Sequence, residues 1–227
     1  MTTFARDGAE RHPGVLSPVD LARLTQVLSD VPPVRAGARL HGIAGLGAFL
    51  NADGPVGRLA ISALGAVPAL GLDARPVRAI LFDKTAGSNW ALGWHQDRTI
   101  AVAARAEVPG YGPWSVKDGL AHGTPPADLL AGMVTLRVHL DPVDVDNAPL
   151  LVAPGSHRLG RVAEGEIADT VRRCGQVACL AEAGDVWLYA TLILHASAAA
   201  TRPRRRRVLQ VDYAIGDLPG GLRWLGV

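Results

Sequence analysis

Cysteine is scarce in this sequence, and no long apolar run occurs in it. The two cysteines among 227 residues are Cys174 and Cys179, and their spacing matches no metal or redox motif. We expect both thiols to be reduced, as in a cytosolic protein. The most apolar stretch, residues 59–72, is too short to span a bilayer and is interrupted by Pro68. Residues 1–10 lack the basic-then-apolar pattern of a signal peptide. These absences predict a cytoplasmic protein without a membrane partner.

A strong excess of one charge is also missing. The net charge is +2, hydrophobic residues make up 48% of the chain and charged residues 19%, which is typical of a compact globular protein and not of a disordered one. The one basic run, residues 202–207, has no interleaved aromatic residues. A nucleic-acid partner is therefore not expected.

Repeats, low-complexity segments and linkers are absent as well, so we expect a single domain over residues 1–227. Residues 17–29 predict a helix, with Ser17 as N-cap and Pro18 at the first helical position. Its apolar stripe consists of Leu21, Leu24 and Leu28. A second helix is predicted over residues 58–66, ending before Pro68.

The pattern changes after this helical layer, which covers about residues 15–70. Short segments rich in branched or aromatic residues alternate with turn residues, and this predicts strands. They are residues 77–84, 133–141, 150–153, 176–180, 185–189 and 206–214. A mainly β protein with flanking α-helices follows, with a jelly-roll core over about residues 77–215 behind the N-terminal helices.

A histidine and an aspartate two residues apart occur twice, as His95/Asp97 and His139/Asp141. On a strand such residues project from the same face and can bind one metal ion. With a distant second histidine they form a two-histidine, one-carboxylate site that leaves three positions open, a geometry suited to iron(II) and O2. His195, after an apolar run, is a candidate for that histidine. The alternatives are a solvent-facing strand for either pair and a core position for His195.

Arg206 follows His195 by eleven residues and begins a predicted strand. An arginine binds a carboxylate through two parallel hydrogen bonds and keeps its charge. A dicarboxylate that chelates a metal ion at one end needs such a partner at its other end.

Four segments, GWHQD, DNAPLLVAPGSHRLG, GDVWLYATLILHAS and RRVLQVDYA, occur in the order found in the phytanoyl-CoA dioxygenase family, which the chain resembles over about residues 77–214. The resemblance implies a double-stranded β-helix, the cupin-like form of the jelly roll, and a 2-oxoglutarate-dependent dioxygenase that hydroxylates a small organic molecule and releases succinate and CO2. It implies Fe(II), 2-oxoglutarate and O2 as cofactors, with His95, Asp97 and His195 as iron ligands. It also implies Arg206 and Ser197 as partners of 2-oxoglutarate.

Within this family pattern the pair His139/Asp141 precedes the turn at Asn147, where the family places no iron. Ala148 stands where the family usually has glycine, which leaves the type of that turn open. Halogenating relatives replace the carboxylate ligand by a small residue, so the presence of Asp97 favours hydroxylation over halogenation.

Several residues are candidates for substrate contact. Arg137 and His139 lie on the polar face of a predicted strand, which is directed either into the barrel or toward water. The remaining candidates are Trp94 and Gln96 beside the ligands, Lys84, and Trp114 and Lys117 in the loop GYGPWSVKDG, which is either a lid or an ordinary packed loop. Trp94 could instead belong to the core, and Lys84 could be solvated. Arg137 and Lys117 together predict a small anionic or zwitterionic substrate.

Two other functions remain open at this point. One is a cupin-like metal-dependent isomerase or hydrolase, against which Arg206 and Ser197 argue. The other is a non-catalytic jelly-roll module that binds a ligand. The sequence specifies neither the substrate, nor hydroxylation over desaturation, nor the oligomeric state.

Overall fold

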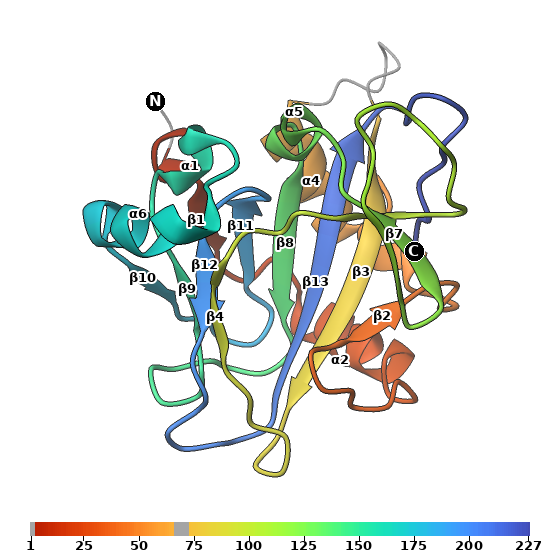
Figure 1. Ribbon diagram of the computed structural model, residues 1–227. Coiled ribbons are helices and arrows are strands. Elements are labelled where there is room, and N and C mark those ends of the chain that lie inside the picture. Colours follow the sequence, from red (N-terminus) through yellow and green to blue (C-terminus); the bar gives the residue numbers. More distant parts are fainter. Residues whose placement is uncertain (1–2, 66–72) are drawn as a thin grey trace.

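Two antiparallel sheets form the core of the protein (Figure 1), for which a computed structural model describes residues 3–65 and 73–227. The larger sheet has the order β1 (Ala9–His12), β11 (Val186–Ala190), β8 (Val134–His139), β13 (Arg206–Ile215), β3 (Ala74–Lys84) and β2 (Ala38–Leu40). The smaller sheet has the order β10 (Val177–Cys179), β9 (Leu150–Val152), β12 (His195–Ser197) and β4 (Leu92–His95). In Figure 1 the smaller sheet lies on the side of the molecule that also holds β1 and β11. The predicted jelly roll is confirmed.

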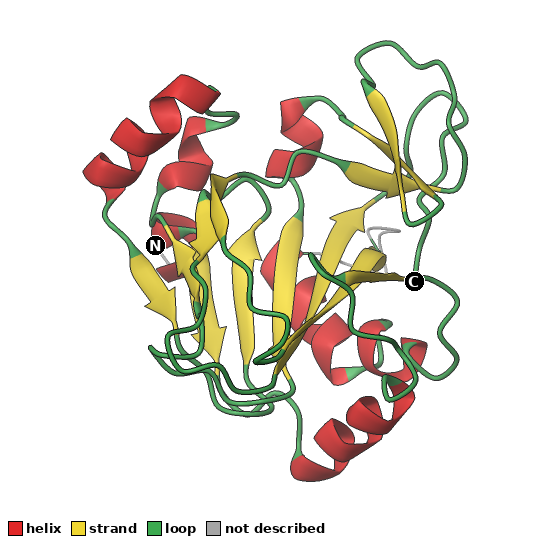
Figure 2. Cartoon of the chain, turned by 60° about the horizontal axis from the view of Figure 1, so that its bottom comes forward, coloured by secondary structure: helices red, strands yellow, loops and turns green. Residues whose placement is uncertain are grey.

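Three helices cover the outer face of the larger sheet: α2 (Pro18–Val27), α3 (Gly47–Leu50) and α4 (Pro55–Leu64) (Figure 2). Their apolar residues share one buried cluster with alternate residues of the strands, among them Leu24, Leu50, Val56, Leu136, Val138, Leu209 and Val211. Each fully buried side chain of this kind contributes about 1.5–3 kcal/mol. This cluster fixes the outer face of β8 and β13, and therefore which residues of these strands face inward.

The two predicted helices are present with shifted ends. Ser17 caps α2 as expected, since its hydroxyl accepts a hydrogen bond from the backbone N–H of Asp20 at 3.1 Å. The second helix begins three residues earlier than predicted, because Gly54 serves as N-cap and Pro55 takes the first helical position. It ends at Gly65, whose φ of 61° is left-handed. Ala66 and Pro68 lie outside the described residues.

The six predicted strands are present, each within three residues of its predicted ends. Other elements gave no clear pattern: β1, β2, β4 and β12 are only three or four residues long. The sequence pattern also did not predict the short helices α1 (Thr3–Asp7), α5 (Ala127–Ala131) and α6 (Ile167–Cys174), or the 3-10 turns Ser156–Leu159 and Glu164–Glu166. No helix in the described parts of the chain is long and apolar enough to cross a membrane.

The predicted loop GYGPWSVKDG is in fact largely a hairpin. Strand β6 (Trp114–Lys117) pairs with β7 (Leu120–Gly123), which also pairs with β5 (Ile100–Val102) in a three-stranded sheet. Trp114 packs in an apolar cluster of this sheet, against Gly123. Lys117, at the end of β6, points back toward the main cavity, which it lines.

The inner face of the larger sheet is polar, unlike its outer face. Arg78, Thr135, Arg137, Gln210 and Asp212 are all buried, and they come from the three central strands β3, β8 and β13. Buried polar groups need partners. The partners that these residues have lie mainly around the site described next.

Candidate metal centre

The smaller sheet brings His95 and His195 together. His95 is the last residue of β4 and pairs directly with His195, the first residue of β12. Their ring centroids are 4.3 Å apart. Asp97 follows two residues after His95, and ligand atoms of all three residues lie within 4.8 Å of one another. These three side chains form a candidate metal site of two imidazoles and one carboxylate, a donor set that suits iron(II).

The imidazoles are oriented by backbone carbonyls. Nδ1 of His95 lies 2.7 Å from the carbonyl oxygen of Gly93, and Nδ1 of His195 lies 2.9 Å from that of Ile193. Because a carbonyl only accepts, each Nδ1 carries the hydrogen and each Nε2 keeps its lone pair. Ligating histidines in metal sites have this same arrangement. The residues present therefore fit a metal ion.

The charge states also fit. Burial lowers the pKa of His195 to about 4, although Asp97 acts in the opposite direction. Burial alone would raise the pKa of Asp97, but the charge of Arg78 and further favourable contacts outweigh it and lower the value to about 2. At neutral pH the site thus offers a neutral imidazole and a carboxylate, the forms that bind metal.

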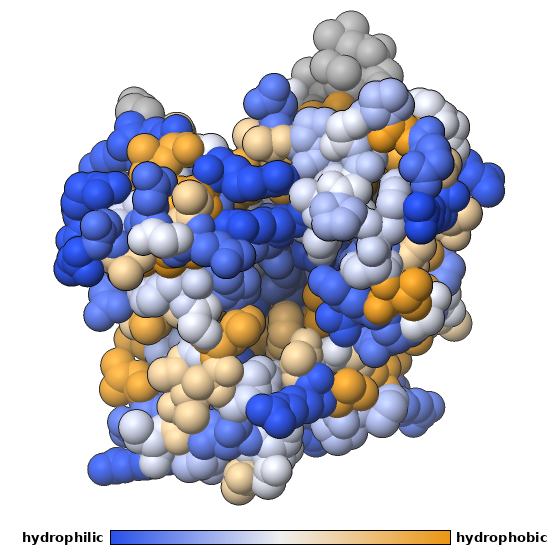
Figure 3. All heavy atoms as spheres, viewed as in Figure 1, coloured by the Kyte–Doolittle hydropathy of each residue, from blue (hydrophilic) through white to orange (hydrophobic). Residues whose placement is uncertain are grey.

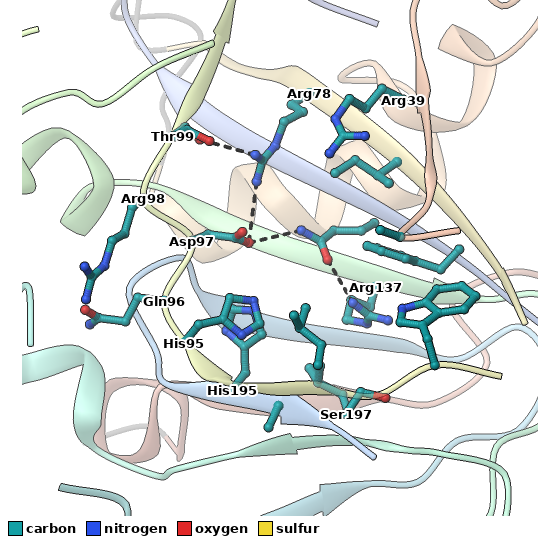
Figure 4. A pocket seen from close by; sticks show the side chains of 18 of the residues that line it. Arg39, Arg78, His95, Gln96, Asp97, Arg98, Thr99, Arg137, His195 and Ser197 are labelled. Carbon is teal, nitrogen blue, oxygen red and sulfur yellow. Dashed lines mark hydrogen bonds and ion pairs between the residues drawn. The ribbon is translucent and has the colours of Figure 1, made fainter. Parts of the chain in front are cut away.

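One oxygen of Asp97 is held by neighbouring side chains (Figure 4). Oδ2 accepts a hydrogen bond from Nε2 of Gln210 at 3.2 Å and lies 3.5 Å from Nη2 of Arg78. The amide of Gln210 cannot turn over without loss, because its oxygen accepts from Nη1 of Arg137 at 2.8 Å. Gln210 and Arg78 together thus hold Oδ2 of Asp97 in place.

Arg78 is fixed in turn by a buried carboxylate. Its Nε donates to Oδ2 of Asp212 at 2.5 Å, and its Nη1 donates to the carbonyl of Thr99 at 3.2 Å. Oδ1 of Asp212 accepts from Thr135 at 3.0 Å, and Thr135 contacts Thr191 at 3.1 Å. The pKa of Asp212 is raised by burial, and Arg78 opposes this effect. A chain of buried polar contacts thus supports Asp97 from the larger sheet.

A cavity of about 350 Å³ opens beside the three candidate ligands. Figure 3 shows the corresponding hollow in the middle of one face, with hydrophilic residues gathered along part of its edge. Besides the candidate ligands, it is lined by Arg39, Arg78, Lys84, Arg98, Lys117, Arg137, Arg206 and Gln210, with Ile80, Phe82, Trp90, Leu92 and Leu150 as apolar surface. The predicted residues Ser197 and Gln96 also line it.

Arg206 and Lys84 face each other across adjacent strands, in the pair that begins β13. Arg206 is buried, its Nη1 donates to the carbonyl of Ala148, and its Nε has no hydrogen-bond partner among the described residues. Burial and Arg137 lower the pKa of Arg206 to about 9. Ala148 has a φ of 53°, the left-handed conformation that glycine usually supplies. The turn at Asn147 and Ala148, where the family usually has glycine at the second position, thus directs the carbonyl of Ala148 at Arg206.

Lys84 is not solvated, as one alternative held, but 4% exposed. Its Nζ donates to the carbonyls of Trp90 at 2.6 Å and Ala198 at 3.3 Å, and to Oγ of Ser197 at 3.2 Å. Burial, Arg206 and Arg137 lower its pKa to about 7. Arg206, Lys84 and Ser197 therefore form a cationic end of the cavity.

Three predicted substrate residues lie outside this cavity. His139 is 2% exposed, faces the barrel interior and has no partner for either ring nitrogen in the described structure. Trp94 packs in the cluster beside α6, and Trp114 belongs to the three-stranded sheet. The packing of these side chains, which a linear pattern does not reveal, places them in the core.

Gln96 lines the cavity but is otherwise engaged. Its Nε2 donates to the carbonyls of Gly160 and Leu192 at 2.8 and 2.7 Å, and its Oε1 accepts from the N–H of Val162 at 2.9 Å. Its amide joins the segments around the metal site.

The sequence analysis did not predict three residues of this site, Arg78, Gln210 and Arg39. Arg78 and Gln210 both fall within predicted strands among apolar residues, and no local signal marks either as part of the site.

The family model for phytanoyl-CoA dioxygenase matches residues 4–208. The chain belongs to the phytanoyl-CoA dioxygenase family. No curated protein matches this chain significantly. Solved structures of the same fold are similar to it at low identity. One is EctD from S. alaskensis with bound Fe, with a TM-score of 0.66, 20% identity, and coverage of 93% of this chain and 74% of that one.

Two further similar structures come from nogalamycin biosynthesis. The alpha-ketoglutarate-dependent carbocyclase SnoK has a TM-score of 0.67 and 18% identity over 99% of this chain and 85% of its own. The epimerase SnoN, in complex with Fe3+, alpha ketoglutarate and nogalamycin RO, has a TM-score of 0.65 and 18% identity, with coverage of 96% and 88%. The family, the fold and the candidate metal site of this chain together support an iron- and 2-oxoglutarate-dependent oxygenase.

Proposed function

We propose that the protein is an Fe(II)- and 2-oxoglutarate-dependent dioxygenase that hydroxylates a small organic molecule, with His95, Asp97 and His195 as metal ligands. The observation that carries the proposal is the convergence of these three side chains, with both Nδ1 atoms bound to backbone carbonyls. The relative EctD has been crystallised with 2-oxoglutarate and 5-hydroxyectoine, a pairing that supports hydroxylation here by analogy.

Each part of the cavity has a role in this reaction. When bound, iron(II) with 2-oxoglutarate activates O2 for oxidation of a C–H bond. Arg206, with Ser197, binds the distal carboxylate of 2-oxoglutarate, since Arg206 has no carboxylate partner of its own among the described residues. Gln210 and Arg78 hold the carboxylate of Asp97 in place. The apolar surface of Phe82, Trp90 and Leu92 excludes water from the reacting groups.

The alternatives use the same fold differently. A cupin-like isomerase or hydrolase needs the metal ligands but no cationic end of the cavity, and a binding module needs no turnover. SnoK is a carbocyclase and SnoN is an epimerase, so this fold also supports outcomes other than hydroxylation. Detection of 2-oxoglutarate chelation separates the oxygenases from the isomerase or hydrolase, and succinate release separates them from the binding module. Analysis of the product separates hydroxylation from the other outcomes.

The test is the visible charge-transfer band of iron(II) chelated by 2-oxoglutarate, measured without O2. We expect a band in the wild type, its loss in His195→Ala, and at least tenfold weaker 2-oxoglutarate binding in Arg206→Ala, because a charge-assisted contact contributes about 1.5–3 kcal/mol. His139→Ala is the histidine control, since His139 lies outside the cavity, and its band should persist.

A folded, iron-loaded wild type without the band would refute the proposed function. A band that survives His195→Ala would refute the ligand assignment alone. After O2 is admitted, succinate release and a product heavier by one oxygen atom would establish hydroxylation.

A further inference from the structure

The lining of the cavity is strongly unbalanced in charge. Seven of its side chains are cationic, and one, Asp97, is a carboxylate. The cationic residues are Arg39, Arg78, Lys84, Arg98, Lys117, Arg137 and Arg206. Buried charges are normally paired, because an unpaired charge loses its hydration without compensation. Three of these cations pair with carboxylates outside the lining: Arg78 with Asp212, Arg39 with Asp118, and Arg98 with Glu164. No described carboxylate forms an ion pair with the other four, Lys84, Lys117, Arg137 and Arg206, and their unpaired positive charge favours an anion as occupant of the cavity.

Six of these cations, all except Arg98, form two clusters, one on each side of the candidate metal ligands. In the first cluster, Arg206 and Arg137 interact electrostatically with Lys84. In the second, Arg78 and Arg39 interact in the same way with Lys117. The clusters border different ligands. Nη2 of Arg78 lies 3.5 Å from Oδ2 of Asp97, whereas Lys84 of the first cluster donates to Ser197, two residues after His195. Figure 4 shows Arg78 and Arg39 on one side of Asp97, and Ser197 on the other side, beyond the two histidines.

The second cluster has unused donors. Lys117 is half-buried, and its Nζ makes one hydrogen bond within the described residues, to Oγ1 of Thr99 at 3.5 Å. It forms no ion pair with a described carboxylate. Arg39 pairs with Asp118 through Nη1 at 2.9 Å, but its Nε is buried and has no hydrogen-bond partner in the described structure. Nη2 of Arg78 also makes no hydrogen bond in the described structure, and its polar contact is the ion pair with Asp97 at 3.5 Å.

Burial, together with the charges of Arg78 and Arg39, lowers the pKa of Lys117, and Asp97 offsets this only in part. An anion at this position would restore the charged form of the lysine and accept hydrogen bonds from several of the unused donors.

We propose that Lys117 and Arg39, with Thr99, bind an anionic oxygen group of the substrate: a carboxylate, phosphate or sulfate. This inference rests on the proposed function, in which 2-oxoglutarate occupies the first cluster, so that the second remains for the substrate. A substrate held there by its anionic end extends past Asp97 toward the metal. The volume of about 350 Å³ fits a small molecule and its co-substrate.

Sulfate is the probe. Sodium sulfate is titrated calorimetrically, at low ionic strength, into protein saturated with Co(II) and 2-oxoglutarate, so that the first cluster is occupied. We expect one saturable site in the wild type. Lys117→Gln should weaken it at least tenfold, because a charge-assisted hydrogen bond is lost, and Lys117→Arg should retain it. Acetate and inorganic phosphate in place of sulfate show which group fits best.

Arg98→Gln is the matched control. Arg98 lines the same cavity and has the same charge, but it donates to the carbonyl of Val162 at 2.7 Å and lies 3.6 Å from Glu164. Sulfate affinity in this variant should stay within about twofold, because Arg98 already has partners. An equal loss in Arg98→Gln and Lys117→Gln would show that only the overall charge matters, and would overturn the assignment.

Two results separate this inference from the proposed function. If the charge-transfer band with Fe(II) is present but the wild type shows no saturable sulfate binding, or Lys117→Gln binds sulfate equally well, the anion subsite is refuted and the oxygenase stands. If the band is absent, the titration is repeated on metal-free protein. Without 2-oxoglutarate both clusters are free, so the wild type should bind two sulfate ions. Loss of one of these two sites in Lys117→Gln would support anion binding by the second cluster without the oxygenase function. Retention of both sites would refute the anion subsite.

Discussion

At the scale of single residues, the candidate ligands are supported in different ways. The histidines are oriented by carbonyls of their own chain segments, whereas Asp97 depends on side chains from β3 and β13, Arg78 and Gln210. Neighbours of this kind typically affect metal affinity 10- to 100-fold. Gln210 is the sharper test, since Arg137 fixes which end of its amide faces Asp97.

We predict that Gln210→Leu lowers the affinity for Co(II) at least tenfold, because Oδ2 of Asp97 loses its hydrogen-bond donor and the carboxylate can turn away. Isothermal titration of Co(II) measures this, with thermal unfolding as a check that the variant is folded. Gln176→Leu is the control, since Gln176 is exposed, and it should bind Co(II) like the wild type. Unchanged affinity in Gln210→Leu would show that Asp97 needs no support from Gln210.

At the scale of elements, the two faces of one strand serve different purposes. On β8, Leu136 packs in the outer apolar cluster, while its neighbour Arg137 lines the cavity. The alternation follows from the period of two in a strand. Changes to adjacent residues should therefore have separate effects.

Leu136→Ala should lower the free energy of unfolding by about 2–5 kcal/mol, the usual effect of removing a fully buried leucine side chain, with Co(II) affinity unchanged in the folded fraction. Urea denaturation and Co(II) titration measure the two quantities. Arg137→Met is the adjacent comparison. It should weaken 2-oxoglutarate binding, measured by titration of the charge-transfer band of the Fe(II) protein, because Arg137 lines the cavity near Arg206, and it should lower the free energy of unfolding less than Leu136→Ala does. Equal losses of 2-oxoglutarate binding and of unfolding free energy in the two variants would contradict this division.

The elements also show what the sequence could predict. The two histidines, Asp97 and Arg206 could be predicted as site residues because short motifs in the family order contain them. The outer faces of the long strands could be predicted from periodicity. Arg78 and Gln210 were missed because their partners lie 134 and 113 residues away for the contacts to Asp212 and Asp97, and local pattern does not specify such pairs. Trp114 and His139 were assigned to the substrate because chemistry alone suggested it, whereas packing places them elsewhere.

At the scale of the whole molecule, a buried histidine links stability to pH. Burial, together with the charges of Arg137 and Arg206, lowers the pKa of His139 to about 3, compared with about 6.5 in an unfolded chain. Below pH 6.5 the imidazole of His139 binds a proton in the unfolded chain but not in the folded protein. The contribution of His139 to stability is therefore complete above about pH 6.5 and declines as the pH falls toward 3.

Between pH 7.5 and 5 the free energy of unfolding of the wild type should fall by about 2 kcal/mol more than that of His139→Leu, because pH 5 lies about 1.5 units below the unfolded pKa. Urea titrations at a series of pH values give both curves. Parallel curves for the two proteins would show that His139 is protonated in the folded state.

The contacts of the two candidate ligand histidines with Gly93 and Ile193 have an evolutionary consequence. Each ring takes its orientation from a carbonyl two residues earlier in the same segment, so no side chain of the cavity wall is needed to hold it. Residues such as Lys117, Arg39 and Leu92 can then be exchanged during divergence without disturbing the imidazoles. A lineage built on this scaffold can change what it oxidises while it inherits the histidine half of its reaction centre intact.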